Sequence, residues 1–348
     1  MIWESLRGHQ EQVEMFRRSL ARGRLSSAYL FSGSAGIGKK LFARMLAQSL
    51  FCKQFPETAL DACGECSNCL QMQAGTYPDF FSIERKTGKK FLTIDLFIGT
   101  DESRGHDGLC YQIALKPMSG DRRVAMIDDV ELMNAESANS LLKTLEEPPE
   151  GAIIILISSN PQALLPTILS RCQQVFFSPL ASTDIVELLI KQEVVTDRQE
   201  AEQIAATCEG SLTAAAKWVD PALCQLRETL HQHLAQGNKM QNVTVAKELV
   251  TLLDEMSDGA QEQRQNGRRL IQFAVEFYHQ SARASSGLSS SINSSASQRF
   301  LQSLTLPLSE KLETIAELAD RATLSDQQLE RSMPIPLCLE ALCADLAR

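Results

Sequence analysis

A glycine-rich stretch followed by two lysines carries the clearest chemistry in this sequence. The segment from Gly33 to Lys39, with Gly36 and Gly38 inside it, matches the phosphate-binding pattern G-x-x-x-x-G-K-[ST] except at the last position, which is Lys40. Glycines let consecutive backbone N–H groups face a phosphate, and Lys39 would reach its oxygens. The hydroxyl usual at the last position ligates Mg²⁺, whereas an ammonium group repels it. We therefore expect a degenerate loop in which ATP binding is doubtful.

The residues around this loop favour phosphate binding over the alternative, an ordinary turn before a helix. Tyr29 to Phe31 form an apolar run typical of a buried strand. The residues after the loop repeat apolar side chains at helical spacing, namely Leu41, Phe42, Met45, Leu46 and Leu50. The loop thus lies between a strand and a helix, as the mechanism requires.

Four cysteines after this helix have the spacing of metal ligands: Cys52, Cys63, Cys66 and Cys69. The last three follow a C-x-x-C-x-x-C pattern, in which each turn presents two sulfurs to a common point. A redox pair and a chance cluster are the alternatives. We favour Zn²⁺ in a structural role, because four protein ligands leave no open position for water.

Polar residues follow two further predicted strands. Asp128 and Asp129 end the apolar run 124–127, as in the Walker B arrangement, where one acid orients Mg²⁺ and the next polarises water. Asp129 is one methylene shorter than the usual Glu, which would misplace a general base. Ser159 and Asn160 follow the run 153–157, at the end of a strand where ligands of open α/β sheets bind. A capped loop is the alternative there.

Composition and charge exclude several classes of protein. The chain has 348 residues, 44% of them apolar, enough for two or three domains. Its net charge of −9 arises in the second half, since residues 1–178 carry 19 Lys and Arg against 20 Asp and Glu. This is not the charge pattern of a protein that grips nucleic acid by itself. We expect a cytoplasmic protein, because the sequence has neither an apolar stretch of membrane-spanning length nor a signal peptide.

The remaining pattern predicts an α/β part followed by helices only. Strands are expected at 80–84 and 175–177, a helix at 2–25, and a helix from Ser137 to Glu147 that two prolines stop. Two or three short helices are expected at 183–219 and longer ones at 222–348, with a flexible serine-rich loop at 281–297. The polar stretch 86–110 has no chemistry that we can assign.

Five segments, taken in this order and spacing, resemble the AAA+ clamp-loader subunits of bacterial DNA polymerase III: SGSAGIGKK, CGECSNC, VAMIDD, LLKTLEEPPE and ILSRC. The resemblance covers residues 1 to about 220. It implies a RecA-like α/β domain at 1–178 with a zinc module at about 52–70, a helical lid at 179–220 and a helical collar for oligomerisation at 221–348.

The resemblance also implies roles for single residues. Arg171 in the SRC string would act as an arginine finger, reaching the ATP site of the adjacent subunit, and Ser159 would hold the sensor-1 position, with Asn160 second. Active motor subunits of the family, gamma and tau, have Thr after the loop lysine, Asp-Glu at Walker B and an arginine after the Gly-Ser of the lid. This chain instead has Lys40, Asp129 and no arginine near Gly210.

Three functions are compared on these grounds. The first is a subunit that does not hydrolyse ATP by itself and supplies Arg171 in trans. The second is an active gamma/tau-like ATPase that tolerates Lys40. The third, a zinc-dependent nucleic-acid binder, is disfavoured by the acidic balance. The resemblance implies as partners the gamma/tau and delta subunits, the sliding clamp and, through the complex, primer-template DNA, with no membrane.

Overall fold

The computed structural model describes residues 2–85, 91–237, 242–287, 295–331 and 333–346. The chain divides into two compact units, the first made of 1–185 with 209–213 and the second of 186–208 with 214–348. Within the described ranges, no helix is both long and apolar enough to cross a membrane. The division into three domains at 178 and 220 stays a prediction.

The first unit is built on a parallel five-stranded sheet in the order β2-β3-β4-β1-β5. Its strands are β1 (Ala28–Ser32), β2 (Phe80–Ile83), β3 (Arg123–Ile127), β4 (Ala152–Ser158) and β5 (Gln173–Phe176). Every residue of β1, β3 and β4 is buried, as expected for strands that helices cover on both faces. The predicted α/β fold is confirmed, and all four strand pairings of its sheet are parallel.

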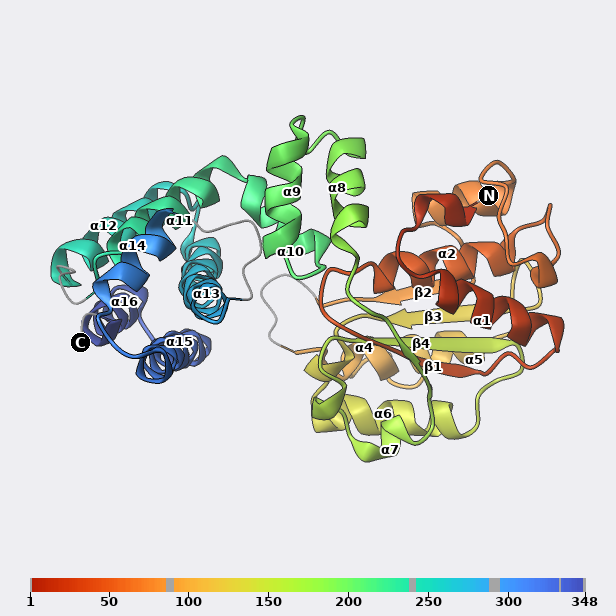
Figure 1. The fold of residues 1–348 in the computed structure, drawn as a ribbon. Helices are drawn as coiled ribbons and strands as arrows, with labels where there is room; N and C mark the ends of the chain where they lie inside the picture. Colours follow the sequence, from red (N-terminus) through yellow and green to blue (C-terminus); the bar gives the residue numbers. More distant parts are fainter. Residues whose placement is uncertain (1, 86–90, 238–241, 288–294, 332, 347–348) are drawn as a thin grey trace. The chain divides into compact units, whose positions relative to one another are not determined.

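Helices cover both faces of this sheet (Figure 1). They are η1 (Ile2–Ser5), α1 (Gln10–Ala21), α2 (Lys39–Phe51), η2 (Glu57–Ala59), α3 (Ser67–Ala74), α4 (Asp95–Ile98), α5 (Leu109–Ala114), η3 (Val130–Leu132), α6 (Ala135–Glu146), η4 (Pro161–Ala163) and α7 (Pro166–Leu169). Phe16 of α1 and Phe42 of α2 pack on Phe31 on one face. Leu141 of α6 and Ile168 of α7 join the core on the other face.

The remaining helices follow: α8 (Ser182–Lys191), α9 (Arg198–Thr207), α10 (Leu212–Val219), α11 (Pro221–Leu234), α12 (Asn242–Glu255), α13 (Ala260–Ser285), α14 (Ser295–Ser303), α15 (Leu308–Glu330) and α16 (Ile335–Leu346). Asp220 caps α11 by accepting backbone hydrogen bonds from Ala222 and Leu223. The second unit has its own core, in which the rings of Phe277 and Tyr278 of α13 pack at steep angles against Phe300 of α14.

Three local predictions are wrong. The helix expected at 2–25 is two elements, η1 and α1, because the chain leaves the helical conformation at 6–9, where Gly8 has a φ of +80°. Residues 281–285 and 295–297 are helical rather than loop, and 288–294 lie outside the described residues. Ser281 fits inside α13 because its hydroxyl donates to the Phe277 carbonyl at 2.8 Å. Leu41, expected on the apolar face of α2, is 51% exposed, because its position falls at the margin of the face that Phe42, Met45 and Leu46 centre.

Candidate functional site

The residues predicted to bind phosphate and the predicted acidic residues all follow strands of one parallel sheet. The glycine-rich loop follows β1, Asp128 follows β3 and Ser159 follows β4. Since parallel strands end at the same edge, these residues gather where ligands of such sheets bind. The structure therefore places the predicted loop and acids on one edge.

The ammonium group of the loop lysine, Lys39, donates hydrogen bonds to carbonyl oxygens of its own loop. Lys39 is 6% exposed, and its Nζ donates to the carbonyl oxygens of Gly33 at 2.5 Å and of Ser34 at 2.6 Å. Burial lowers the pKa of Lys39, although nearby carboxylates act in the opposite direction. Its ammonium thus lies within the turn of the glycine-rich loop.

A later segment of the chain packs on the same loop. The Leu212 N–H donates to the carbonyl of Gly36 at 3.0 Å. Gly36 has a φ of +76°, and a Cβ there would lie 2.6 Å from Cβ of Thr213. This position thus requires glycine for its conformation and for the close approach of residues 211–213.

Lys40 forms ion pairs with two acids of the sheet edge. Its Nζ lies 2.5 Å from Oε2 of Glu84 and 3.5 Å from Oδ2 of Asp128. The hydrogen bond from Lys40 is the main cause of the lowered pKa of Glu84. A carboxylate that already faces an ammonium group is a poor ligand for Mg²⁺, which requires a nearly octahedral oxygen set. The residues present therefore do not fit a divalent metal beside this loop.

The second acid of the predicted Walker B pair is not the acid that contacts Ser159. Asp129 has a φ of +50°, and burial, then the carboxylates of Asp128 and Glu131, raise its pKa. Glu131 Oε1 instead accepts hydrogen bonds from Ser159, at 2.8 Å from Oγ and 3.0 Å from the backbone N–H. Burial pushes the pKa of Glu131 up, but its hydrogen bonds outweigh this effect and lower it.

Arg171 lies between α7 and β5 and contacts its own chain. Its Nη2 forms an ion pair with Oε1 of Glu146 at 2.7 Å. Its Nη1 donates to the carbonyl of Thr167 at 2.9 Å and to Oγ of Ser170 at 3.2 Å. The guanidinium is partly exposed and is held on both of its terminal nitrogens.

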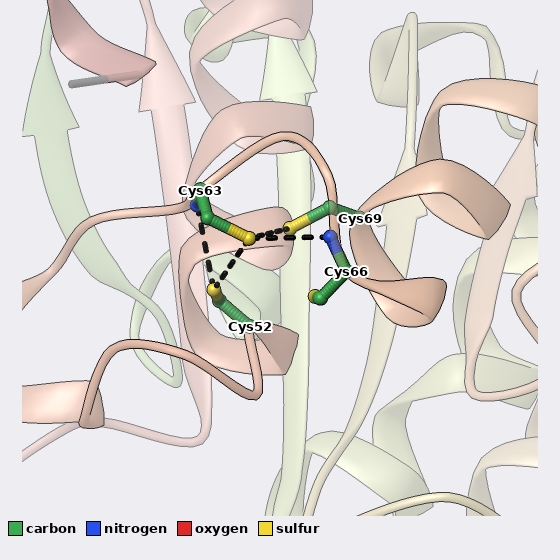
Figure 2. A group of neighbouring side chains, drawn as sticks. All are labelled: Cys52, Cys63, Cys66 and Cys69. Carbon is green, nitrogen blue, oxygen red and sulfur yellow. Dashed lines mark hydrogen bonds between the residues drawn. The ribbon is translucent and has the colours of Figure 1, made fainter.

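The four predicted metal ligands lie together (Figure 2). The sulfur atoms of Cys52, Cys63, Cys66 and Cys69 are all within 4.8 Å of one another, and all four thiols are free. Four sulfurs at about 2.3 Å from one tetrahedral zinc ion are about 3.8 Å apart. The Sγ of Cys63 lies 3.8 Å from that of Cys52 and 3.9 Å from that of Cys69, so the geometry fits such an ion. The predicted convergence is confirmed, and the identity of the metal remains a proposal.

Backbone N–H groups support negative charge on these sulfurs. The N–H of Cys63 donates to Sγ of Cys52 at 3.4 Å, and that of Cys66 donates to Sγ of Cys63 at 3.3 Å. Hydrogen bonds of this kind stabilise thiolates, the form that binds a metal. The donor set is therefore suited to a cation and has no need of a disulfide.

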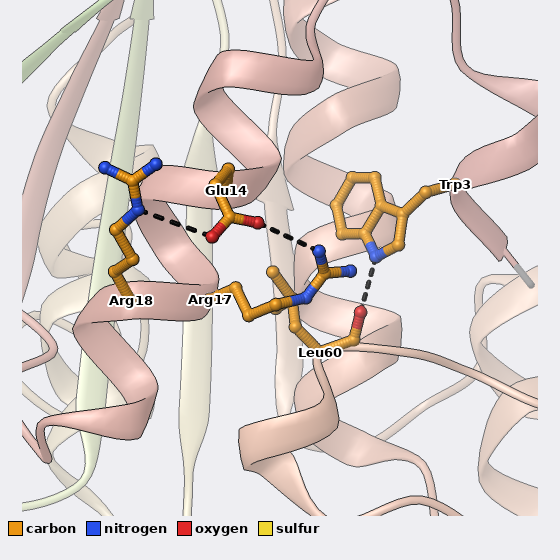
Figure 3. Close-up of polar contacts among 5 residues, drawn as sticks. All are labelled: Trp3, Glu14, Arg17, Arg18 and Leu60. Atoms are coloured by element: carbon orange, nitrogen blue, oxygen red, sulfur yellow. Dashed lines mark hydrogen bonds and ion pairs between the residues drawn. The ribbon is translucent and has the colours of Figure 1, made fainter.

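An open cleft of about 390 Å³ lies between η1 and α1. It is lined by Trp3, Glu4, Leu6, Gln10, Val13, Glu14 and Arg17. Figure 3 shows that the carboxylate of Glu14 is engaged by Arg17 and Arg18 and that the Trp3 indole donates to the carbonyl of Leu60 at 2.6 Å. The charges of Arg17 and Arg18 on α1 are thus partly neutralised by Glu14, and the Trp3 hydrogen bond joins η1 to Leu60, in the segment before Cys63.

Sequence reasoning missed three residues of the site. Glu84 and Glu131 belong to the acidic edge, and position alone could have indicated Glu84, which directly follows β2. Buried His9 contacts the carbonyl of Ile37 through Nε2 at 2.6 Å, and burial lowers its pKa. No local pattern signals His9, because the contact joins residues 28 positions apart.

Comparison with known proteins gives consistent matches. The family model described as "DNA polymerase III, delta subunit" matches residues 8–181, half of the chain. DNA polymerase III subunit delta' of Pseudomonas aeruginosa is 40% identical over 153 residues, which are 44% of this chain and 43% of that protein. DNA polymerase III subunit tau of Escherichia coli is 34% identical over 222 residues, 62% of this chain and 32% of that protein.

The chain spans about a third of the length of the tau subunit and less than half of the length of the delta' subunit. A solved structure of a DNA polymerase III gamma subunit-related protein from Thermotoga maritima is 18% identical, with a TM-score of 0.45, and the match covers 97% of this chain and all of that one.

Proposed function

Because the chain belongs to the DNA polymerase III, delta subunit family, we propose that it is an ATPase-defective subunit of a clamp loader, of the delta-prime or stator type. In this role it helps to load the sliding clamp on primed DNA. Its partners are the gamma/tau motor subunits and the delta subunit, and it supplies Arg171 to the nucleotide of a neighbouring motor subunit.

The observation that carries this proposal is the pairing of Lys40 with Glu84 and Asp128. A protein that hydrolyses ATP at a loop of this kind needs a hydroxyl and a carboxylate on Mg²⁺. Here the ammonium of Lys40 stands in place of that hydroxyl and is also paired with the carboxylate of Asp128.

Arg171 remains suited to chemistry in trans. It is an exposed guanidinium outside the defective site, on a short turn between α7 and β5. A guanidinium placed at a transferring phosphoryl group of a neighbour stabilises the charge of the transition state. In the proposed complex, this side chain is the part of the chain that contributes to hydrolysis.

An active gamma/tau-like ATPase is the second candidate, favoured by the similarity to the tau subunit of Escherichia coli. The two functions differ in what the purified chain does alone. We expect negligible Mg²⁺-dependent ATP turnover, whereas steady turnover of about 1 s⁻¹, an ordinary enzymatic rate, would establish the motor instead.

The role of Arg171 is tested in the reconstituted complex. Arg171→Ala should slow ATP hydrolysis at the site of the neighbouring motor subunit by roughly 10³-fold or more, the lower range for a lost arginine finger, and so lower the rate of the complex. Arg198→Ala serves as a control, because it also removes an exposed guanidinium with a carboxylate partner. Equal rates for the two variants would remove the trans role.

A further inference from the structure

The contacts of Arg171 define a resting position for its side chain. The turn of α7 fixes Nη1 through Thr167 and Ser170, while the end of α6 fixes Nη2 through Glu146. The helices α6 and α7 pack together on one face of the sheet (Figure 1). Both anchoring segments therefore belong to the same rigid layer.

The position of Glu146 has no benefit for its own helix. It is the last residue of α6, which ends before Pro148 and Pro149. A carboxylate at a helix C-terminus faces the negative end of the helix dipole, where a cation is preferred. The ion pair with Arg171 offsets this unfavourable placement of Glu146.

A carboxylate and a phosphate compete for the same guanidinium. Both present oxygen atoms that accept hydrogen bonds from adjacent N–H groups of an arginine. The side chains of Arg171 and Glu146 are 34% and 49% exposed. An ion pair so open to water is weak and exchanges readily for a stronger anion.

We propose that Glu146 is a latch that holds Arg171 on its own subunit until a nucleotide phosphate of the neighbouring subunit displaces it. The proposal rests on the trans role of Arg171 proposed above. Glu146 touches no reacting atom and acts only through the position of Arg171. It sets the fraction of time in which the guanidinium is available, and in this way restrains hydrolysis by an incompletely assembled complex.

The test is ATP hydrolysis by the reconstituted complex carrying Glu146→Gln, which keeps the shape of the side chain and removes its charge. We expect the rate without clamp and DNA to rise about two- to fivefold, as for the loss of one exposed ion pair. Glu147→Gln is the matched control, since it removes the same charge one residue later, and no ion pair joins Glu147 to another residue of the described ranges. Its rate should equal that of the wild type.

A double variant separates the latch from a structural effect. Glu146→Gln combined with Arg171→Ala should be as slow as Arg171→Ala alone, because the latch acts only through the guanidinium. If Arg171→Ala is slow while Glu146→Gln is no faster than Glu147→Gln, the latch is wrong and the trans role stands. If Arg171→Ala has the wild-type rate, both the latch and the trans role are wrong.

Discussion

Replacing Lys40 with threonine should give the glycine-rich loop a site for magnesium and nucleotide. The change removes the ammonium that pairs with Glu84 and Asp128 and supplies the hydroxyl that the phosphate-binding pattern has at this position. Both carboxylates would then face the loop without a competing cation. We therefore expect Lys40→Thr to bind Mg²⁺-ATP more tightly than the wild type.

The size of the effect follows from the distance between Lys40 and Asp128. Nζ of Lys40 lies 3.5 Å from Oδ2 of Asp128, and we use this distance as the scale of the repulsion between the ammonium and a Mg²⁺ ion that Asp128 would hold. A single and a double positive charge at that separation repel by about 2 kcal/mol in water and by about 9 kcal/mol at an effective dielectric constant of 20. Because the Lys40 side chain is 38% exposed, we take the lower value, which is roughly 30-fold in affinity.

The assay is titration of the purified chain with a fluorescent ATP analogue, with Mg²⁺ and with EDTA. Lys40→Met removes the charge without adding a hydroxyl and should recover only part of the gain, and Lys40→Arg should recover none. Unchanged Mg²⁺-dependent affinity in a folded Lys40→Thr variant would refute the argument that this ammonium excludes the metal.

Three further predictions concern the metal, acid stability and a buried ion pair. Metal-replete protein should contain one zinc per chain by elemental analysis, and Cys66→Ser should lower this content while Cys172→Ser, outside the cluster, should not. Burial lowers the pKa of His231 from 6.5 to about 4, so the unfolded chain takes up the proton first. Urea unfolding should therefore show stability falling by about 3 kcal/mol as the pH drops through that window, and His231→Leu should reduce the loss. Asp79→Ala leaves buried Arg123 without its carboxylate and should cost about 3–5 kcal/mol in the same assay.

The sequence predicted the parts of the site that depend on local pattern. The loop, the cysteine cluster and the strands of the sheet each have a spacing that only a few structures satisfy, as Gly33 to Lys39 and Cys63 to Cys69 illustrate. Strand ends then bring Asp128 and Ser159 to one edge, which follows from parallel pairing alone.

The partners of the charged side chains could not be predicted in this way. Lys40 pairs with Glu84, 44 positions away, and Ser159 contacts Glu131 rather than Asp129. Such choices depend on the register of neighbouring strands and on side-chain length, which periodicity does not encode. The prediction of a loop in the serine-rich segment was wrong for a related reason. Burial of Phe277 and Tyr278 in α13 outweighs the weak helix propensity of the serines after them.

Helix α2 begins next to Gly38 and ends next to Cys52. Its 13 residues form a stiff rod about 20 Å long, with the phosphate loop at one end and the first sulfur of the cysteine cluster at the other. Loss of the proposed metal ion would therefore tilt or fray α2 and so disturb the glycine-rich loop at its other end. Hydrogen–deuterium exchange, measured before and after chelation, would show this disturbance as faster exchange of the backbone amides of residues 33–38.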